Sequence, residues 1–387
     1  MIRPLRSFLA IFLFSALGLA MTSAEDAKDI EGHRSRPMGI QDVDSFDYFI
    51  APGFNGAPQA GQAFQAAAHE DYDMLIADYY AGHNTIDPAG VRIFQESNSR
   101  SIFRWPADPR GRLAIAYLDA GEFMRCCSNI DLPDQALWFD AQGELTAAAP
   151  SWFGPRTPNF KNLWVVRDWD PAWQSYILGE IDIIIALGFD GVFLDTLYND
   201  GAWGPHGSAA GLAGVADYRE SQKDFARAIW HHVRVRHHNS RFVIITNYSG
   251  VLEDNVPALS EGLHYSDAFM KESEYFLDNK PAPWVGNAPI EQWFATRYDK
   301  FYAAMFKLHK IVLLQDYNLT FDHEALMLEE AARYGFLLSN TNFPQNLIHI
   351  DALPFCTKEA CWATNAAGQT VRFRRTEDDD DDADRRR

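Results

Sequence analysis

The sequence is poor in cysteine and in basic residues. It has four cysteines, and neither the pair Cys126 and Cys127 nor the pair Cys356 and Cys361 has the spacing and companion ligands of a zinc site. Lysine and arginine number 34 against 53 aspartates and glutamates, a formal net charge of -19. This charge argues against nucleic acid or an anionic membrane surface as a partner and is compatible with a cationic substrate.

Motifs for several reaction classes are also missing. The sequence contains no Gly-x-Ser-x-Gly elbow, no phosphate-binding loop and no dinucleotide fingerprint. We therefore expect neither hydride transfer nor an ATP-driven reaction, and we expect no cofactor. There is no internal repeat and no signal for an oligomeric state. A composition of 47% hydrophobic and 22% charged residues is typical of a globular protein that can build a large core.

The N-terminal segment predicts a cleaved secretory signal over residues 1–24. Arg3 and Arg6 precede an apolar stretch at residues 8–20, and small residues follow at 22–24. The alternative is an uncleaved anchor, but the apolar core is short for a span and no later stretch is long enough. We therefore expect a secreted or periplasmic protein without a stable membrane span after signal cleavage. Residues 25–45 are predicted to be a linker, and residues 377–387 an acidic disordered tail.

In an oxidising compartment Cys356 and Cys361 could close a small loop near the C-terminus. Cys126 and Cys127 are adjacent, and a bond between neighbours is strained. Free thiols and a link to another segment therefore both remain open for them.

The central part of the chain alternates short apolar runs with helical segments, as in a parallel sheet with outer helices. This pattern predicts an α/β protein, a (β/α)8 TIM barrel over residues 46–351 with a small C-terminal extension at 352–376. Helices are expected at 173–187, 218–235, 290–309 and 323–334, and residues 128–161 are expected to form a long loop over the barrel top. The expected strands are 48–51, 74–79, 113–118, 191–197, 242–246, 268–271, 311–314 and 336–339.

Polar side chains gather at the C-terminal ends of these strands, the face on which barrel enzymes carry out their chemistry. Asp195 is the first candidate, since it ends the apolar run after Gly188; alone it could also cap the next turn or pair with a basic neighbour. The other strand-end residues are Asp78, Tyr79, Tyr117, Asp119, Gly121, Glu122, Asn247, Tyr248, Glu272, Glu274, Asp316 and Tyr317.

Hydrolysis of a glycosidic bond requires two carboxyl groups, one protonated to serve the leaving oxygen and one ionised to attack or to activate water. Asp195 and Glu272 can supply them from the ends of nonadjacent strands. Glu274 competes with Glu272, because alternation along an extended segment puts both side chains on the same side. Glu122 is a third candidate for the acid or a substrate-binding residue.

Tryptophans and histidines are further candidates for substrate and metal binding. Rings that pack on sugar faces are expected among the tryptophans of the predicted loops, with Trp169 and Trp203 as the candidates; the others are Trp152, Trp164 and Trp284. The histidines of a predicted helix could attract a metal ion, but no matched carboxylate accompanies them in the sequence, so we expect no metal site. They are His231, His232, His237 and His238.

Together these motifs resemble glycoside hydrolase family 114, the endo-alpha-1,4-polygalactosaminidases. The resemblance is carried by the Leu-Ile-Ala-Asp-Tyr strand with Asp78, the segment 116–122 that contains Tyr117 and Glu122, and the segment 188–195 that ends at Asp195. Arg125, Asn247 and Glu272 complete it. It covers roughly residues 47–351.

The resemblance implies a barrel hydrolase that cuts a partly deacetylated, cationic galactosamine polymer. In that family picture Asp195 is the nucleophile or base and Glu272 is the general acid. The substrate-binding residues would be Asp78, Tyr117, Glu122, Arg125, Asn247, Glu274, Tyr317, Trp169 and Trp203. The alternative is a barrel that only binds polysaccharide, since a fold alone does not confer activity.

Overall fold

The structure is a computed structural model. It describes residues 39–49, 72–78, 112–124, 137–157, 163–197, 215–247, 263–272, 276–277, 280–281, 305, 308–317, 319–341, 355–356, 360–364 and 370–374. Within these ranges no helix has both the length and the apolar character to cross a membrane. The predicted signal and acidic tail lie outside the described residues.

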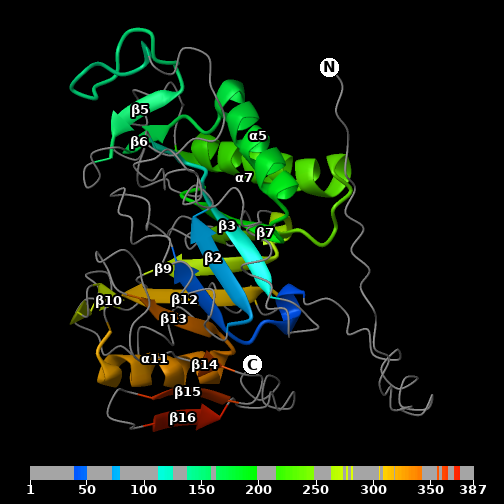
Figure 1. The fold of residues 1–387 in the computed structure, drawn as a ribbon, viewed down its shortest axis with the longest axis vertical. Coiled ribbons are helices and arrows are strands. Elements are labelled where there is room, and N and C mark those ends of the chain that lie inside the picture. Colours follow the sequence, from blue (N-terminus) through cyan, green and yellow to red (C-terminus); the bar gives the residue numbers. More distant parts are fainter. Residues whose placement is uncertain are drawn as a thin grey trace, which may run out of the picture. The chain divides into compact units, whose positions relative to one another are not determined.

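Eight parallel strands form the central sheet, as the sequence predicted (Figure 1). Each strand pairs with the next one in the sheet order, and the first and last strands, β1 and β13, also contact each other. The sheet is therefore a nearly closed TIM-type barrel. Its strands are β1 (Phe46–Phe49), β2 (Met74–Asp78), β3 (Leu113–Asp119), β7 (Gly191–Asp195), β8 (Val243–Asn247), β9 (Ala268–Glu272), β12 (Ile311–Tyr317) and β13 (Leu337–Thr341).

The strands are held in the barrel by burial on both faces, which explains why they read as continuous apolar runs. All seven residues of β3 are buried, as are the first four of β7. Phe193, Tyr48 and Tyr117 stack or meet edge to face inside this core. In β7 only the last residue, Asp195, is partly exposed. The strand therefore leaves the core at this carboxylate.

Helix α5 (Pro171–Leu187) begins two residues before the expected range of 173–187 and ends where the sequence predicts. The Asp170 side chain caps its N-terminus by accepting a hydrogen bond of 2.8 Å from the backbone N–H of Ala172. Gly188 ends it in the left-handed region at φ 86°, where glycine carries no steric penalty. Gly188 therefore ends α5 and turns the chain towards β7.

The other predicted helices are found in part. The segment expected at 218–235 is α7 (Val215–His231) followed by η3 (His232–Arg236), which is a π-helix, and α11 spans Phe321–Tyr334. The helix expected at 290–309 falls almost entirely outside the described residues. Single turns occur at η1 (Ile40–Asp42) and η4 (Leu263–Tyr265); Ile40 of η1 is buried, although it lies within the predicted linker.

The segment 128–161, expected to form a long loop over the barrel top, contains a strand in its described part. This strand is β5 (Phe153–Arg156), which joins β4 (Glu122–Met124) and β6 (Leu163–Val166) in an antiparallel sheet of order β4-β6-β5. The sheet is held by an aromatic cluster around Phe123, which packs against Trp138, Trp152 and Phe153. Scattered proline and glycine hid these short strands, because aromatic packing rather than strand propensity stabilises them.

The predicted C-terminal extension contains a three-stranded antiparallel sheet that packs against α11. Its strands are β14 (Phe355–Cys356), β15 (Ala360–Thr364) and β16 (Thr370–Arg374). Cys356 of β14 stands opposite Cys361 of β15 in the register. A disulfide between them remains a prediction. A further short hairpin pairs β10 (Phe276–Leu277) with β11 (Lys280–Pro281).

Close packing at Gly191 generates a stability prediction. A Cβ atom at Gly191 would lie 2.4 Å from the Val243 carbonyl oxygen of β8 and 2.7 Å from Cδ1 of Ile115. We expect Gly191→Ala to lower the free energy of unfolding by about 1–3 kcal/mol, since β7 would be pushed away from β8. Urea denaturation measures it. The control is Gly39→Ala, whose Cβ would meet only the flexible ends of Gln41 and Asp42; an equal loss in both variants would contradict this account.

Candidate active site

The ends of six strands bring together a group of polar side chains that we call the strand-end site. Because all eight strands run parallel, their carboxyl ends lie on the same face of the barrel. Hydrogen bonds on this face connect residues that are far apart in the sequence, for example Tyr48 and Glu272. The strand-end site consists of Tyr48 (β1), Tyr117 (β3), Asp195 (β7), Asn247 (β8), Glu272 (β9) and Tyr317 (β12).

Asp195 accepts hydrogen bonds on both carboxylate oxygens. The Tyr117 hydroxyl donates to Oδ2 at 2.5 Å, and the Asn247 side-chain amide donates to Oδ1 at 2.7 Å. The backbone N–H of Thr196 also donates to Oδ1 at 2.8 Å. Three donors from three segments therefore fix the direction of this carboxylate before any substrate is present.

Glu272 lies beside Asp195 and is held from a different side. The Tyr48 hydroxyl donates to its Oε1 at 2.9 Å, and Tyr317 makes a further side-chain hydrogen bond. Burial raises the pKa of Glu272 to about 7, and the negative charge of Asp195 adds to this, while the hydrogen bonds from Tyr48 and Tyr317 oppose it. Glu272 can thus keep a proton near neutral pH.

Asn247 connects the two acids directly. Its side-chain nitrogen donates to Asp195 Oδ1 at 2.7 Å and to Glu272 Oε1 at 3.2 Å. Since both oxygens are within hydrogen-bonding reach of one nitrogen, they lie at most about 6 Å apart. Asp195 and Glu272 come from nonadjacent strands, as predicted, and their carboxyl groups lie close together at the strand ends.

A second set of bonds joins the end of β3 to the end of β7. The Thr196 hydroxyl donates to Asp119 Oδ1 and accepts from the backbone N–H of Gly121 at 2.9 Å. Thr196 itself has φ 53°, an unusual conformation for a β-branched residue. A Cβ atom at Gly121 would lie 2.4 Å from the Thr196 carbonyl oxygen, so glycine is required for this close approach.

Glu122 is a third acid of this face and begins β4. Its Oε1 accepts a hydrogen bond of 3.1 Å from the Thr157 hydroxyl. Burial raises the pKa of Glu122 to about 7, and the Asp195 charge contributes. Burial likewise raises the pKa of Asp119 well above its usual value, with further contributions from Glu122 and Asp195. The charge of Asp195 thus raises the pKa of three neighbouring acids, Asp119, Glu122 and Glu272.

The tyrosines of the strand-end site act as neutral donors. Burial raises the pKa of Tyr48, Tyr117 and Tyr317 well above 10, and the neighbouring carboxylates raise it further. Each phenol therefore keeps its proton and can donate to Asp195 or Glu272 throughout the physiological pH range.

The remaining predicted residues are placed differently. Asp78 ends β2 and pairs in register with Tyr117, and Trp169 lies partly exposed in the turn between β6 and α5. Arg125, Trp203, Glu274 and Trp284 lie outside the described residues. Trp152 and Trp164 are buried in the aromatic core of the β4-β6-β5 sheet, so they serve as core residues rather than as sugar platforms.

Three functional neighbours were not singled out from the sequence. Tyr48 sits in the short aromatic strand β1, and only the position of its neighbours in the barrel shows that its hydroxyl reaches Glu272. Thr196 follows the Asp195 motif directly, and its hydroxyl was a usable signal. Thr157 directly follows β5, and no sequence pattern indicated that its hydroxyl would reach Glu122.

Comparison with protein families and curated proteins yields short matches. No family model matches the chain. An uncharacterized protein of Deinococcus radiodurans is 34% identical over 98 residues, which is 24% of this chain and 28% of the relative. The uncharacterized protein MJ1477 of Methanocaldococcus jannaschii is 30% identical over 97 residues, 25% of each chain. The matched region thus spans about a quarter of each relative.

Several solved structures have a similar fold, and three of them are compared with this chain. Ega3 of Aspergillus fumigatus, solved in complex with galactosamine, has a TM-score of 0.49 at 15% identity over 81% of this chain and 97% of that one. The glycoside hydrolase domain of PelA from Pseudomonas aeruginosa has 0.44 at 16%, over 80% and 97%. The glycoside hydrolase domain of PgaB (BpsB) from Bordetella bronchiseptica has 0.46 at 14%, over 79% and 95%. At such identities neither substrate nor catalytic residues carry over.

The raised pKa of Glu272 is directly measurable. In protein labelled with ¹³C at glutamate side chains, the carboxyl signal that Glu272→Gln removes should titrate with a pKa of about 7. In Asp195→Asn this pKa should fall, because the neighbouring negative charge is gone. Asp224→Asn on the outer face of α7 should leave it unchanged. A value near 4.5 in the wild type, or no response to Asp195→Asn, would contradict the described environment.

Proposed function

We propose that this protein is a secreted, endo-acting glycoside hydrolase that cleaves a cationic, partly deacetylated galactosamine-containing polysaccharide. The observation that carries the proposal is the side-chain amide of Asn247. It donates to both Asp195 and Glu272 and so holds one oxygen of each carboxyl group within about 6 Å of the other. Two carboxyl groups at such a distance are what glycosidic bond hydrolysis requires.

The environments of the two acids support different roles. Glu272 is half-buried beside Tyr48 and Tyr317 and has its pKa raised to about 7, which suits an acid that must deliver a proton to the leaving oxygen at neutral pH. Asp195 accepts three hydrogen bonds that fix its orientation, which suits a group that attacks or positions water at one defined point. We therefore assign Glu272 as general acid and Asp195 as nucleophile or base.

The separation also bears on stereochemistry. Retaining glycosidases have their carboxyl groups about 5–5.5 Å apart, whereas inverting enzymes leave about 6.5–9.5 Å for a water molecule. The two oxygens that share the Asn247 amide lie at most about 6 Å apart, closer than the carboxyl separation of inverting enzymes, so we propose retention, with Asp195 as the nucleophile that forms a glycosyl intermediate.

The charge of the protein supports a cationic substrate. Deacetylated galactosamine units carry an ammonium group at neutral pH, and the strand-end site lies beside Asp119 and Glu122 in a chain of net charge -19. Such a field attracts a polycation and raises its local concentration. The sugar itself is proposed from the sequence resemblance to the polygalactosaminidases.

Removal of either acid tests the assignment. With partly deacetylated galactosaminan as substrate and oligomers detected by mass spectrometry, Glu272→Gln should lower the rate by roughly 10²–10⁴-fold, the usual contribution of a general acid. Asp195→Asn should lose at least as much. In the wild type, NMR should show the first product with the anomeric configuration of the substrate.

Asp224→Asn is the matched control, because its carboxylate lies exposed on α7 and pairs with Arg227. It should keep the wild-type rate. If Asp195→Asn and Glu272→Gln released oligomers as fast as the wild type, the assignment would be wrong. If the wild type bound the polymer without releasing any oligomer, the chain would be a polysaccharide-binding barrel instead.

The pH profile separates Glu272 from its rival Glu122, whose pKa is also raised to about 7. A general acid must be protonated, so kcat/KM should fall about tenfold per pH unit above pH 7. Glu122→Gln should keep this alkaline fall, even with a lower rate. Glu272→Gln should abolish it. The reverse pattern would assign the acid to Glu122.

A further inference from the structure

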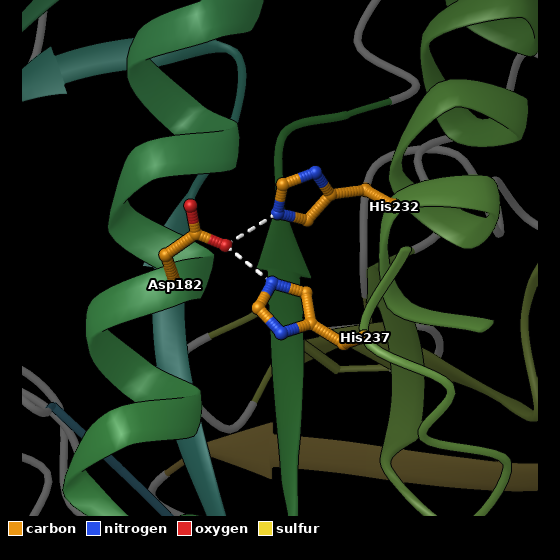
Figure 2. A group of neighbouring side chains, drawn as sticks. All are labelled: Asp182, His232 and His237. Atoms are coloured by element: carbon orange, nitrogen blue, oxygen red, sulfur yellow. Dashed lines mark hydrogen bonds and ion pairs between the residues drawn. The ribbon is translucent and has the colours of Figure 1, made fainter. Parts of the chain in front are cut away.

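A cluster of metal-binding side chains lies outside the strand-end site. Figure 2 shows Asp182 of α5 facing two histidines. His232 is the first residue of η3, and His237 directly follows η3. Asp182 Oδ1 lies 2.6 Å from Nε2 of His232 and 2.5 Å from Nε2 of His237. The expectation that these histidines lack a matched carboxylate is therefore wrong: the carboxylate comes from a helix 50 residues earlier in the chain.

The π-helix explains why these two histidines face the same way. They are five positions apart in the sequence, a spacing that in an α-helix would place the side chains well over 100° apart around the axis. In η3 the backbone N–H of His237 donates to the carbonyl oxygen of His232 at 3.1 Å, so one wider turn stacks residue 237 over residue 232. Their rings lie 5.0 Å apart, and both Nε2 atoms point at Asp182.

The cluster has an inner and an outer side. The His232 side chain is only 4% exposed, whereas the side chains of His237 and Asp182 are 28% and 39% exposed. A ligand bound between them would thus be held from within by His232 and could keep contact with solvent on the other side.

We propose that Asp182, His232 and His237 form a binding site for a divalent transition metal ion, with Zn²⁺ as the ion best matched to two imidazoles and one carboxylate. Zn²⁺ takes histidine nitrogen and carboxylate oxygen at about 2.0–2.2 Å in a tetrahedron, so the three ligand atoms move apart by somewhat less than 1 Å from their hydrogen-bonded distances. Each imidazole binds as the neutral ring through Nε2, with its proton on Nδ1. A water molecule on the exposed side fills the fourth position.

The place of the cluster in the fold assigns the ion a structural role. α5 leads through Gly188 into the start of β7, and η3 leads into the start of β8. Asp182 and the two histidines therefore lie in the outer layer toward the N-terminal face of the barrel, opposite the strand-end site, a face that contributes stability rather than chemistry. The ion would fasten α5 to η3 and hold the wide turn in place.

The test uses the full chain without an affinity tag, treated with EDTA and dialysed. Titration calorimetry with ZnCl₂ should show one equivalent bound, and excess Zn²⁺ should raise the melting temperature, since a ligand that binds only the folded state stabilises it. Asp182→Asn and His237→Gln should each weaken binding at least tenfold and remove the rise in melting temperature. His231→Gln is the matched control, because His231 is exposed and adjacent to the cluster.

Two further measurements keep the outcome decisive. X-ray absorption of the zinc-loaded wild type should show scattering from two imidazole rings, which decides the question even where a variant fails to fold. The double variant Asp195→Asn, Glu272→Gln should bind Zn²⁺ as the wild type does. The proposal is overturned if the wild type takes up no Zn²⁺, if His237→Gln binds as well as His231→Gln, or if loss of the strand-end acids abolishes binding.

Discussion

The face of the barrel at the strand ends holds four carboxyl groups near one another, and the site depends on how their mutual repulsion is relieved. Asp119, Asp195 and Glu272 end strands β3, β7 and β9, and Glu122 begins β4, three residues after the end of β3. Two solutions are visible. Neutral donors surround Asp195 and Glu272, and retained protons lower the charge of Glu122 and Glu272, as their raised pKa values indicate. The same arrangement gives Glu272 and Asp195 different properties, since Glu272 has a raised pKa and Asp195 accepts three hydrogen bonds.

The barrel and its central acids could be predicted from the sequence, because both follow from local patterns. Each of the eight apolar runs became a strand of the parallel sheet, and the helix expected at 173–187 became α5. Parallel strands then force their tips to the same face, so Asp195 and Glu272 could be expected to meet. Asn247, in the predicted site as well, links them.

What could not be predicted depends on contacts between distant segments. Trp152 and Trp164 read as surface aromatics in a loop, but the β4-β6-β5 sheet buries them around Phe123. Asp182 reads as an ordinary helix residue, and its meeting with His232 depends on the packing of two helices. The wide turn of η3 has no sequence signal either, since an α-helical reading places His232 and His237 on different sides.

The backbone at Thr196 limits which residues the chain can accept after Asp195. Position 196 needs a hydroxyl that reaches both Asp119 and Gly121, and it also needs a side chain that tolerates φ 53°. Glycine and asparagine meet the second requirement, valine meets neither, and serine alone among small residues keeps the hydroxyl without the extra methyl group. Few residue types can therefore replace Thr196. Its neighbour Gly121 has to remain glycine, because a Cβ atom there would collide with the Thr196 carbonyl oxygen.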